Sequence, residues 1–315
     1  MLTKIDWEGW SAWQLENNSL RVVIIPQLGA KIVSFFDKQA QHEWLAKPRR
    51  PLRAAPYNAS FVDYDLSGWD EMCPTIIACH YPAPGPFQGR MLPDHGEVWA
   101  LPWSVEAANE MVLSLSVQGQ ALPYRLKRAA KFTSSGTLCL DYELFNQGRD
   151  SLAYLWAAHP LFAVDRHTRI VLPPEVNELY NVLIQSPWGE AGARYPWPVA
   201  KDETGSLWQL DRVGPVSNRD CRKFYVPPET PINWVKLEQT HSGNWLQLAW
   251  SSAQIPFMGL WIDEGAYSAE PAVAPEPASA FYDSLVTAWE LQQVSVLAPG
   301  TVHTWQVSAQ IGLDE

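Results

Sequence analysis

The chain has 315 residues, enough to bury a large core in one large domain or in two ordinary ones. Aromatic residues make up 12% of it, with 17 Trp and 26 Pro, while only 18% of residues are charged; this balance favours many strands joined by proline-rich loops over a helical bundle. The formal net charge of −11 disfavours nucleic acid and anionic membranes as partners, because both reward clustered Lys and Arg. A small neutral molecule is the expected ligand.

The spacing of the cysteines and the lengths of the apolar runs indicate the cellular compartment of the protein. The four Cys residues show no C-x-x-C spacing and no pairing with nearby His, so neither a metal site nor a redox motif is expected. The first ten residues lack the apolar segment of a signal peptide, and no run approaches the roughly 18 apolar residues of a membrane helix. We therefore expect a cytoplasmic protein.

Residues 20–25 and 31–37 form the first predicted hairpin. Both are rich in β-branched and aromatic residues, and Gly29 marks the turn between them. Residues 47–53 follow as the only basic cluster, and its prolines exclude a helix. We interpret this cluster as a solvated loop in preference to an anion-binding site.

Polar and aromatic residues are interspersed in residues 58–74, which contain too many turn-forming residues for a single strand. Long loops in compact domains are usually functional or disordered, and this one is too aromatic for disorder. The sequence thus predicts a long loop that offers Trp69, Asp70 and Glu71 to the wall of a pocket.

Residues 91–103 place an imidazole between a carboxylate and a glycine. Pro93 and Gly96 bracket a bend, so we expect Asp94 and His95 to be displayed on a loop. Either side chain could instead only bond the local backbone.

Period-2 alternation of apolar and polar residues recurs in three later stretches, 111–118, 138–144 and 305–311, as in half-buried strands. Strand character returns at 245–251 and 257–262, and residues 284–292 predict a short helical turn. Strands recurring about every dozen residues with turns between them predict an all-β fold, an antiparallel sandwich or barrel. No internal repeat is found, and we expect one domain over residues 1–315.

Residues 173–230 are the least periodic part of the chain. They contain two Pro-Pro-Glu segments and predict irregular loops that cover one side of the protein. This segment by itself indicates no function.

Two further polar residues stand in unusual surroundings. His159 follows the apolar run 152–158 and precedes Pro160, so it lies at the end of an expected core strand, either as a satisfied core histidine or as a general acid at a cleft. Glu276 lies between Pro275 and Pro277, which hold its backbone extended and suit a positioned base. Glu270 shares the Glu-Pro dipeptide but lacks the small residues that follow Glu276, so we interpret it as an ordinary loop carboxylate.

The stretches around His95, His159 and Glu276, together with Phe-Met-Gly-Leu-Trp at 257–261, resemble the aldose 1-epimerase (galactose mutarotase-like) superfamily. Comparable His-Gly, His-Pro and Glu-Pro elements occur in that superfamily in this order. The resemblance implies a large antiparallel β-sandwich, the galactose mutarotase-like supersandwich, with a sugar cleft on one face. It also implies that Glu276 is the base that takes the proton from the anomeric hydroxyl. His159 would be the acid that donates to the ring oxygen, and His95 would bind the substrate near that oxygen.

This chemistry needs no cofactor. One proton leaves O1 and one reaches O5, after which bond rotation and reclosure give the other anomer. Each positioned proton transfer contributes about 10² to 10⁴ in rate. Glu276 is expected to start ionised and His159 protonated, each charge favouring the other.

The chain departs from the family pattern in two places. It has Asp-His-Gly-Glu where galactose mutarotases have Leu-His-Gly-Gly, and the family's Asn-Arg element upstream is not found, so the sugar stays open. Arg90 is a candidate replacement contact for a sugar hydroxyl. Trp69, Trp156 and Trp261 are candidates for an aromatic face, although Trp is most often core.

Three other functions stay open. A hexose-6-phosphate 1-epimerase would need a cationic pocket, for which only residues 47–53 and Arg90 are available. A non-catalytic sugar-binding protein could use the same fold. A glycoside hydrolase would need a second carboxylate with Glu276, from Asp70, Glu71 or Asp94.

Overall fold

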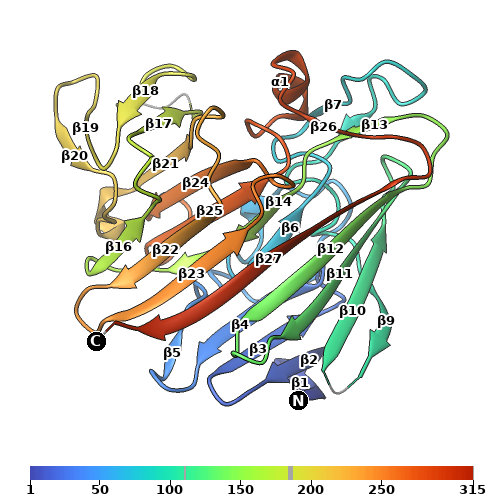
Figure 1. The fold of residues 1–315 in the computed structure, drawn as a ribbon, viewed down its shortest axis with the longest axis horizontal. Coiled ribbons are helices and arrows are strands. Elements are labelled where there is room, and N and C mark those ends of the chain that lie inside the picture. Colours follow the sequence, from blue (N-terminus) through green and yellow to red (C-terminus); the bar gives the residue numbers. More distant parts are fainter. Residues whose placement is uncertain (110, 184–186, 315) are drawn as a thin grey trace.

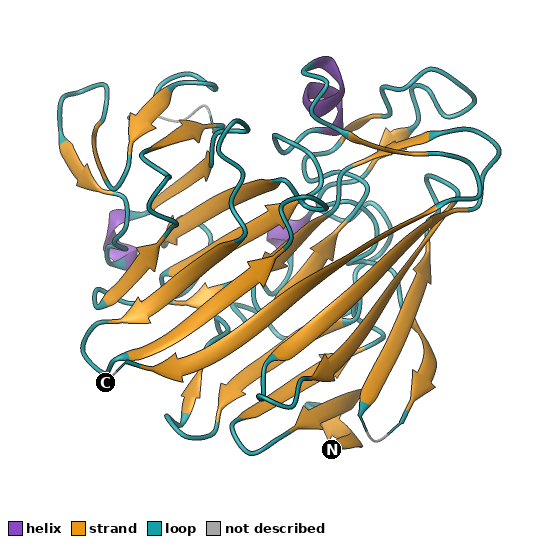
Figure 2. Ribbon diagram, viewed as in Figure 1, coloured by secondary structure: helices purple, strands orange, loops and turns teal. Residues whose placement is uncertain are grey.

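The computed structural model describes residues 1–109, 111–183 and 187–314. In this part of the chain, two large antiparallel sheets of 13 and 8 strands lie one in front of the other (Figure 1), and helices are short and few (Figure 2). The predicted all-β antiparallel sandwich is therefore confirmed. None of the helices in these residues is long and apolar enough to cross a membrane.

The larger sheet has the order β1-β2-β3-β4-β6-β14-β25-β24-β21-β17-β18, with β5 paired to β4 and β15 paired to β25. Its strands are β1 (Leu2–Trp7), β2 (Trp10–Glu16), β3 (Leu20–Ile25), β4 (Lys31–Asp37), β5 (His42–Glu43), β6 (Trp69–Met72), β14 (Ala157–Pro160), β15 (Phe162–Ala163), β17 (Glu178–Asn181), β18 (Arg194–Pro196), β21 (Asp220–Tyr225), β24 (Phe257–Glu264) and β25 (Ala272–Ala278).

The smaller sheet has the order β16-β22-β23-β27-β12-β11-β10-β9. Its strands are β9 (Ser104–Ala108), β10 (Val112–Gln118), β11 (Tyr124–Phe132), β12 (Leu138–Asn146), β16 (Thr168–Val171), β22 (Trp234–Gln239), β23 (Asn244–Trp250) and β27 (Val302–Leu313). The period-2 stretches predicted from the sequence are β10, β12 and β27.

Shorter elements lie outside the two large sheets. Three two-stranded pairs and three helices complete the described part: β7 (Cys79–His80) with β8 (Met91–Leu92), β13 (Leu152–Tyr154) with β26 (Ser295–Leu297), β19 (Val199–Lys201) with β20 (Leu207–Gln209), the 3-10 helices η1 (Phe61–Asp63) and η2 (Val216–Asn218), and α1 (Leu285–Glu290). The short helical turn predicted over 284–292 is α1, which begins after the Ser284 cap: the Ser284 hydroxyl accepts from the Val286 N–H.

Glu71 joins the two sheets inside the core. Its Oε1 accepts from Arg128 Nη1 at 2.7 Å and from the Tyr142 hydroxyl at 2.8 Å, both on the smaller sheet. Its Oε2 accepts from Trp156 Nε1 at 3.0 Å, and Tyr142 stacks on Trp305 with ring centroids 5.3 Å apart. The buried carboxylate is thus paired and hydrogen-bonded, as a charge in a core must be.

Two sequence predictions about loops were wrong. Residues 58–74 are not one long loop, because Trp69–Met72 form β6 in the middle of the larger sheet. Residues 173–230 contain five strands, including β21, although residues 184–186 lie outside the described part. Both segments lack clean period-2 alternation because their strands are short or buried on both faces, which removes the polar positions that mark a half-buried strand.

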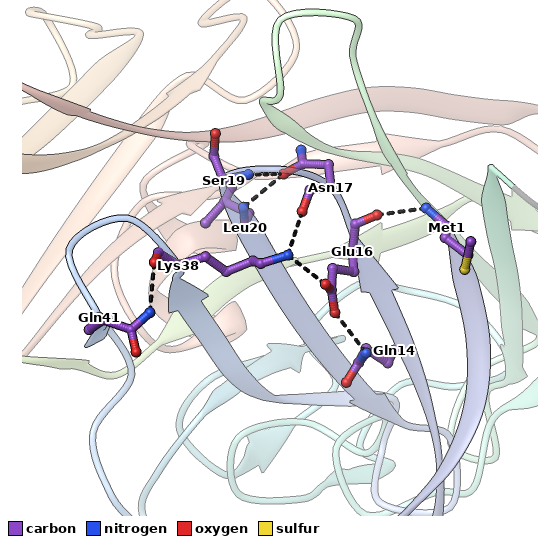
Figure 3. A network of polar contacts seen from close by, with 8 residues as sticks. All are labelled: Met1, Gln14, Glu16, Asn17, Ser19, Leu20, Lys38 and Gln41. Atoms are coloured by element: carbon purple, nitrogen blue, oxygen red, sulfur yellow. Dashed lines mark hydrogen bonds and ion pairs between the residues drawn. The ribbon is translucent and has the colours of Figure 1, made fainter.

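The first strands of the larger sheet are tied together by polar contacts (Figure 3). Lys38, just after β4, reaches Glu16 Oε1 at 2.5 Å and the Asn17 carbonyl at 3.0 Å. Asn17 Oδ1 accepts from the backbone N–H groups of Ser19 and Leu20, which closes the turn between β2 and β3. This network lies at the opposite edge of the sheet order from β21 and serves the hairpins, not the site described next.

Candidate active site

A row of polar residues crosses the larger sheet on the face that points away from the core. Successive side chains of a strand point to opposite faces, so Asp70 faces away from the side that holds Glu71. The β6–β14 register pairs Asp70 with His159, and the β24–β25 register pairs Glu276 with Gly259. The Ala157–Ala278 pair between β14 and β25 sets the register that brings His159 opposite Glu276.

His159 and Glu276 meet in this row. His159 Nε2 lies 3.9 Å from Glu276 Oε1, and both side chains are almost fully buried. Nδ1 of His159 has no hydrogen-bond partner among the described residues. His159 and Glu276, which the sequence analysis assigns to one site, therefore lie beside each other in the structure.

Prolines open the ladder at this point. Pairing of β25 with β14 and β15 occurs, within the described residues, at Ala157–Ala278 and then again from Phe162–Val273. Pro160, Pro275 and Pro277 lie between these points and have no N–H to donate. In the described part of the chain, β14 and β25 are therefore not joined by backbone pairing where His159 and Glu276 stand.

Lys223, on β21, is a candidate site residue that the sequence analysis missed. Its Nζ donates to Glu276 Oε2 and lies 3.6 Å from Asp283 Oδ1. Gly259 makes the room: a Cβ there would lie 3.2 Å from Lys223 Cε and 3.3 Å from its Nζ. The available signal was the alternation of Cys221, Lys223 and Tyr225 on one face of a strand, which places a charge where an apolar residue is usual.

The loop after β8 brings His95 to the same place. His95 adopts a left-handed backbone with φ of +58°, and its Nδ1 lies 3.0 Å from Asp94 Oδ1. Its ring stacks on Phe61 at 4.2 Å between centroids and lies 5.3 Å from the ring of His159. Asp94 Oδ2 accepts from the Phe61 N–H at 2.8 Å, so the carboxylate joins the His95 loop to η1.

These groups line a cavity of about 250 Å³. Its polar lining includes His95, His159, Lys223, Glu276 and Asp283, and its apolar lining includes Phe61, Leu161, Trp261 and Tyr267. Polar groups that converge on one side of an otherwise apolar hollow are the usual form of a small-molecule site.

Burial sets the protonation of the row. Burial, and then the charges of His95, Lys223 and Lys31, lower the pKa of His159 well below its ordinary value. Its imidazole is therefore neutral near pH 7, and the prediction that His159 starts protonated was wrong. A neutral imidazole can still donate one ring N–H as a hydrogen bond.

The Glu276–Lys223 pair carries the charge of the site. Burial raises the pKa of Glu276, and Lys223 opposes that rise. Burial alone would lower the pKa of Lys223, but Asp283 and Glu276 outweigh it and the net shift is upward. Because the ammonium touches the carboxylate directly, the ion pair is the ground state of the two groups.

The remaining sequence candidates are divided by the structure. Trp261 lines the cavity, and Asp94 supports His95 from behind. Trp69 and Trp156 are fully buried, Trp69 against Phe162 and Trp156 against Trp305. Neither of them lines the cavity in the described part of the chain, because both belong to the core.

Asp70 and Arg90 also lie off the cavity lining that the described residues form. Asp70 is buried beside His159 and is 3.0 Å from Lys31 Nζ. Arg90 Nη1 donates to the Ala121 carbonyl at 2.8 Å, and its guanidinium lies over the Phe87 ring. Neither placement suits direct contact with a sugar.

Solved structures share this architecture along the whole chain. A galactose mutarotase-like protein from Lactobacillus casei ATCC 334 has a TM-score of 0.69 at 16% identity, with 96% of this chain and 100% of that chain covered. A galactose mutarotase-like protein from Clostridium acetobutylicum gives 0.69 at 13% identity over 100% and 99% of the two chains. A galactose mutarotase related enzyme from Lactobacillus acidophilus gives 0.68 at 15% over 96% and 97%.

The chain has a galactose mutarotase-like fold. No family model matches the sequence, and no curated protein matches it. With identities of 13 to 16%, the likeness extends to the galactose mutarotase-like fold alone, and the chemistry of the site depends on the residues of this chain.

Proposed function

We propose that this protein is a cofactor-independent mutarotase that interconverts the α and β anomers of a neutral aldose. The observation that carries the proposal is Glu276, a buried carboxylate with one oxygen toward His159 and the other on Lys223, at a cavity of sugar size. Ring opening requires a base at O1 and a proton donor at O5, and this arrangement has both kinds of group within reach.

Glu276 is the base. Its raised pKa makes the carboxylate more basic than an exposed one, and the neighbouring ammonium keeps it ionised near pH 7. His159 and His95 contact the substrate around the ring oxygen through their N–H groups, and Trp261 lies against an apolar face of the ring.

The surroundings favour a neutral sugar over a sugar phosphate. Lys223 is the one Lys or Arg among the described lining residues, and two carboxylates, Glu276 and Asp283, already neutralise it. Arg90 and the basic cluster at residues 47–53 do not line the cavity in the described part of the chain. A phosphate brought here would meet a net negative charge, which costs binding free energy.

The test is the rate at which freshly dissolved α-glucose and α-galactose reach anomeric equilibrium, followed by one-dimensional proton NMR. We expect the protein to accelerate it and Glu276→Gln to lose about 10²-fold or more of that acceleration, because the amide cannot accept the O1 proton. Glu270→Gln is the matched control, since Glu270 is the neighbouring Glu-Pro carboxylate and, among the described residues, accepts from the Lys47 N–H at 2.8 Å and does not line the cavity.

Saturable sugar binding with no acceleration would contradict the proposal and support a non-catalytic sugar-binding protein on this fold. Acceleration with glucose 6-phosphate alone would contradict the choice of a neutral sugar. Equal loss in the Glu270→Gln control would show that the effect is not specific to the cavity.

A further inference from the structure

Among the described residues that line the cavity, Lys223 is the only Lys or Arg, the side chains that are ordinarily positive near pH 7. It also contacts Glu276, the proposed base. An ammonium has three N–H donors. One is used by Glu276 Oε2, and a second faces Asp283 Oδ1 at 3.6 Å. The third is used by neither of these carboxylates, and Lys223 lines the cavity.

We propose that Lys223, in place of His159, donates the proton to the ring oxygen, so that Glu276 and Lys223 act as one bifunctional acid–base pair. This assignment rests on the proposed mutarotase function. Lys223 would thus be a catalytic residue that touches the reacting atoms, and His159 a residue that binds the sugar.

The step balances within the pair. Glu276 Oε1 takes the O1 proton, the O1–H electrons form the C1=O1 double bond, and the C1–O5 bond breaks with its electron pair going to O5. Lys223 Nζ gives one proton to O5, which leaves a carboxylic acid, an amine and an open-chain hydroxyaldehyde. After rotation about C1–C2, O5 attacks the other face of C1, its proton returns to Nζ, and Glu276 returns its proton to O1.

The coupling between the two groups supports this order of events. Glu276 and Asp283 hold the Lys223 ammonium in its charged form against the effect of burial. When Glu276 accepts the O1 proton it loses its charge, so Asp283 alone still opposes the effect of burial and Lys223 gives up its proton more easily. Proton uptake by the base therefore makes the acid stronger at the moment when O5 needs a proton.

His159 is less suited to the donor role. Its neutral ring would become an imidazolate anion on giving up its proton. That anion is far less stable than the neutral amine that Lys223 becomes when it gives up a proton. Burial and the nearby cations Lys223 and Lys31 oppose the imidazolium form that could donate easily. Its Nε2 is instead placed to hold a substrate oxygen beside Glu276 Oε1.

The experiment compares two variants by the same anomer NMR assay, with sugar binding measured by calorimetry. Lys223→Arg keeps the charge and the contact with Glu276, but a guanidinium cannot give up a proton in a protein. We expect it to bind sugar and to lose about 10²-fold or more of the acceleration. His159→Gln, which keeps an N–H donor, is expected to lose less than Lys223→Arg does.

Chemical rescue separates a catalytic from a structural role. In Lys223→Ala, which leaves space beside Gly259, added methylammonium is expected to restore acceleration in proportion to its concentration, whereas equal tetramethylammonium is not, because it has no proton to give. Rescue by both ions equally would overturn the assignment, since charge alone would then suffice.

The remaining outcomes are distinguishable. An active wild-type protein whose Lys223→Arg variant is equally active overturns the Lys223 assignment and leaves the mutarotase intact. No acceleration by the wild-type protein overturns both. If Lys223→Ala does not fold, Lys223→Arg against His159→Gln still decides, because a greater loss in His159→Gln returns the donor role to His159.

Discussion

Lys31, Asp65 and Asp70 form a second buried charge cluster next to His159, and the two carboxylates experience opposite surroundings. Lys31 Nζ lies 2.5 Å from Asp65 Oδ2 and 3.0 Å from Asp70 Oδ2. Burial raises the pKa of Asp70 to about 7, with Lys31 only partly compensating. Burial also acts on Asp65, but Lys31 and the Ser67 hydroxyl outweigh it and lower its pKa. One ammonium thus fully stabilises one carboxylate and not the other.

This difference predicts opposite pH effects on stability. An Asp70 pKa of about 7 in the folded protein lies above the ordinary 3.8, so Asp70 contributes stability at low pH that is lost as pH rises from about 4 to about 7. Asp70→Asn should therefore gain stability relative to the wild type over that window. Urea unfolding of both proteins at pH 4.5 and pH 8 measures it, and the comparison cancels other groups such as His159.

Asp65→Asn is the matched control for Asp70→Asn. The pKa of Asp65 is lowered, so its contribution to stability is present above about pH 4 and is lost at lower pH. We expect Asp65→Asn to be destabilised at pH 8, where Asp70→Asn is not. The same direction of change in both variants would contradict the account of the cluster.

At the scale of elements, the loop that carries His95 depends on one glycine. Gly96 has a φ of +69°, and a Cβ there would lie 2.2 Å from the Cys73 carbonyl oxygen. The Glu97 N–H also donates to that carbonyl at 2.7 Å, so the backbone of the loop is held against residue 73. The position of the imidazole therefore follows from a close backbone approach.

Gly96→Ala should displace this loop. Gly300→Ala is the control, because Gly300 has a φ of +66° and a Cβ added there would meet nothing within 4 Å, so both variants carry the left-handed strain and only the first carries the clash. We expect Gly96→Ala to lose more stability in thermal unfolding and also to weaken sugar binding. Equal losses in the two variants would show that strain alone matters.

The sequence was informative where elements alternate and uninformative where they are buried on both faces. Strands β10, β12 and β27 were predictable because one face of each is partly exposed. His95, His159 and Glu276 could be chosen as site candidates because the Pro and Gly residues beside them mark unusual backbone. β6 was not predictable, since all four of its residues are buried. Trp69, Trp156 and Arg90 were chosen by residue type, which carries no information on the direction of a side chain.

Lys223 could not be paired with Glu276 from sequence. The two lie 53 residues apart on β21 and β25, separated in the sheet by β24, and the contact exists because Gly259 of β24 has no side chain. Contacts of this kind depend on strand order and register, which the local pattern does not contain. The same holds for Phe61, whose ring reaches His95 from η1.

At the scale of the whole molecule, the two sheets are joined by a buried ion pair. Arg128 Nη1 and Glu71 Oε1 are 2.7 Å apart with both side chains fully buried. Removing one member of such a pair leaves the other charge buried without a partner, which costs about 3 to 5 kcal/mol of folding free energy. Glu71→Gln is therefore expected to lower the free energy of unfolding by that order, measured by urea denaturation.

Glu143→Gln is the control for Glu71→Gln. Glu143 Oε2 lies 3.7 Å from Lys127 Nζ on the same sheet as Arg128, and its side chain is half exposed. Exposed pairs of this kind contribute little to stability. An equal loss of stability in the two variants would contradict a special role for the buried pair.

The row from Asp70 through His159 to Glu276, with Lys223 beyond it, is formed by strands from distant parts of the chain. Its end residues, Asp70 and Glu276, lie more than 200 residues apart in the sequence. Contacts between distant segments form late in folding, because the long loops between them must close first. Early folding intermediates would then lack the base and its ammonium partner together. Recovery of sugar binding during refolding should thus report completion of the larger sheet, and should lag behind the signal of the β10–β11–β12 hairpins.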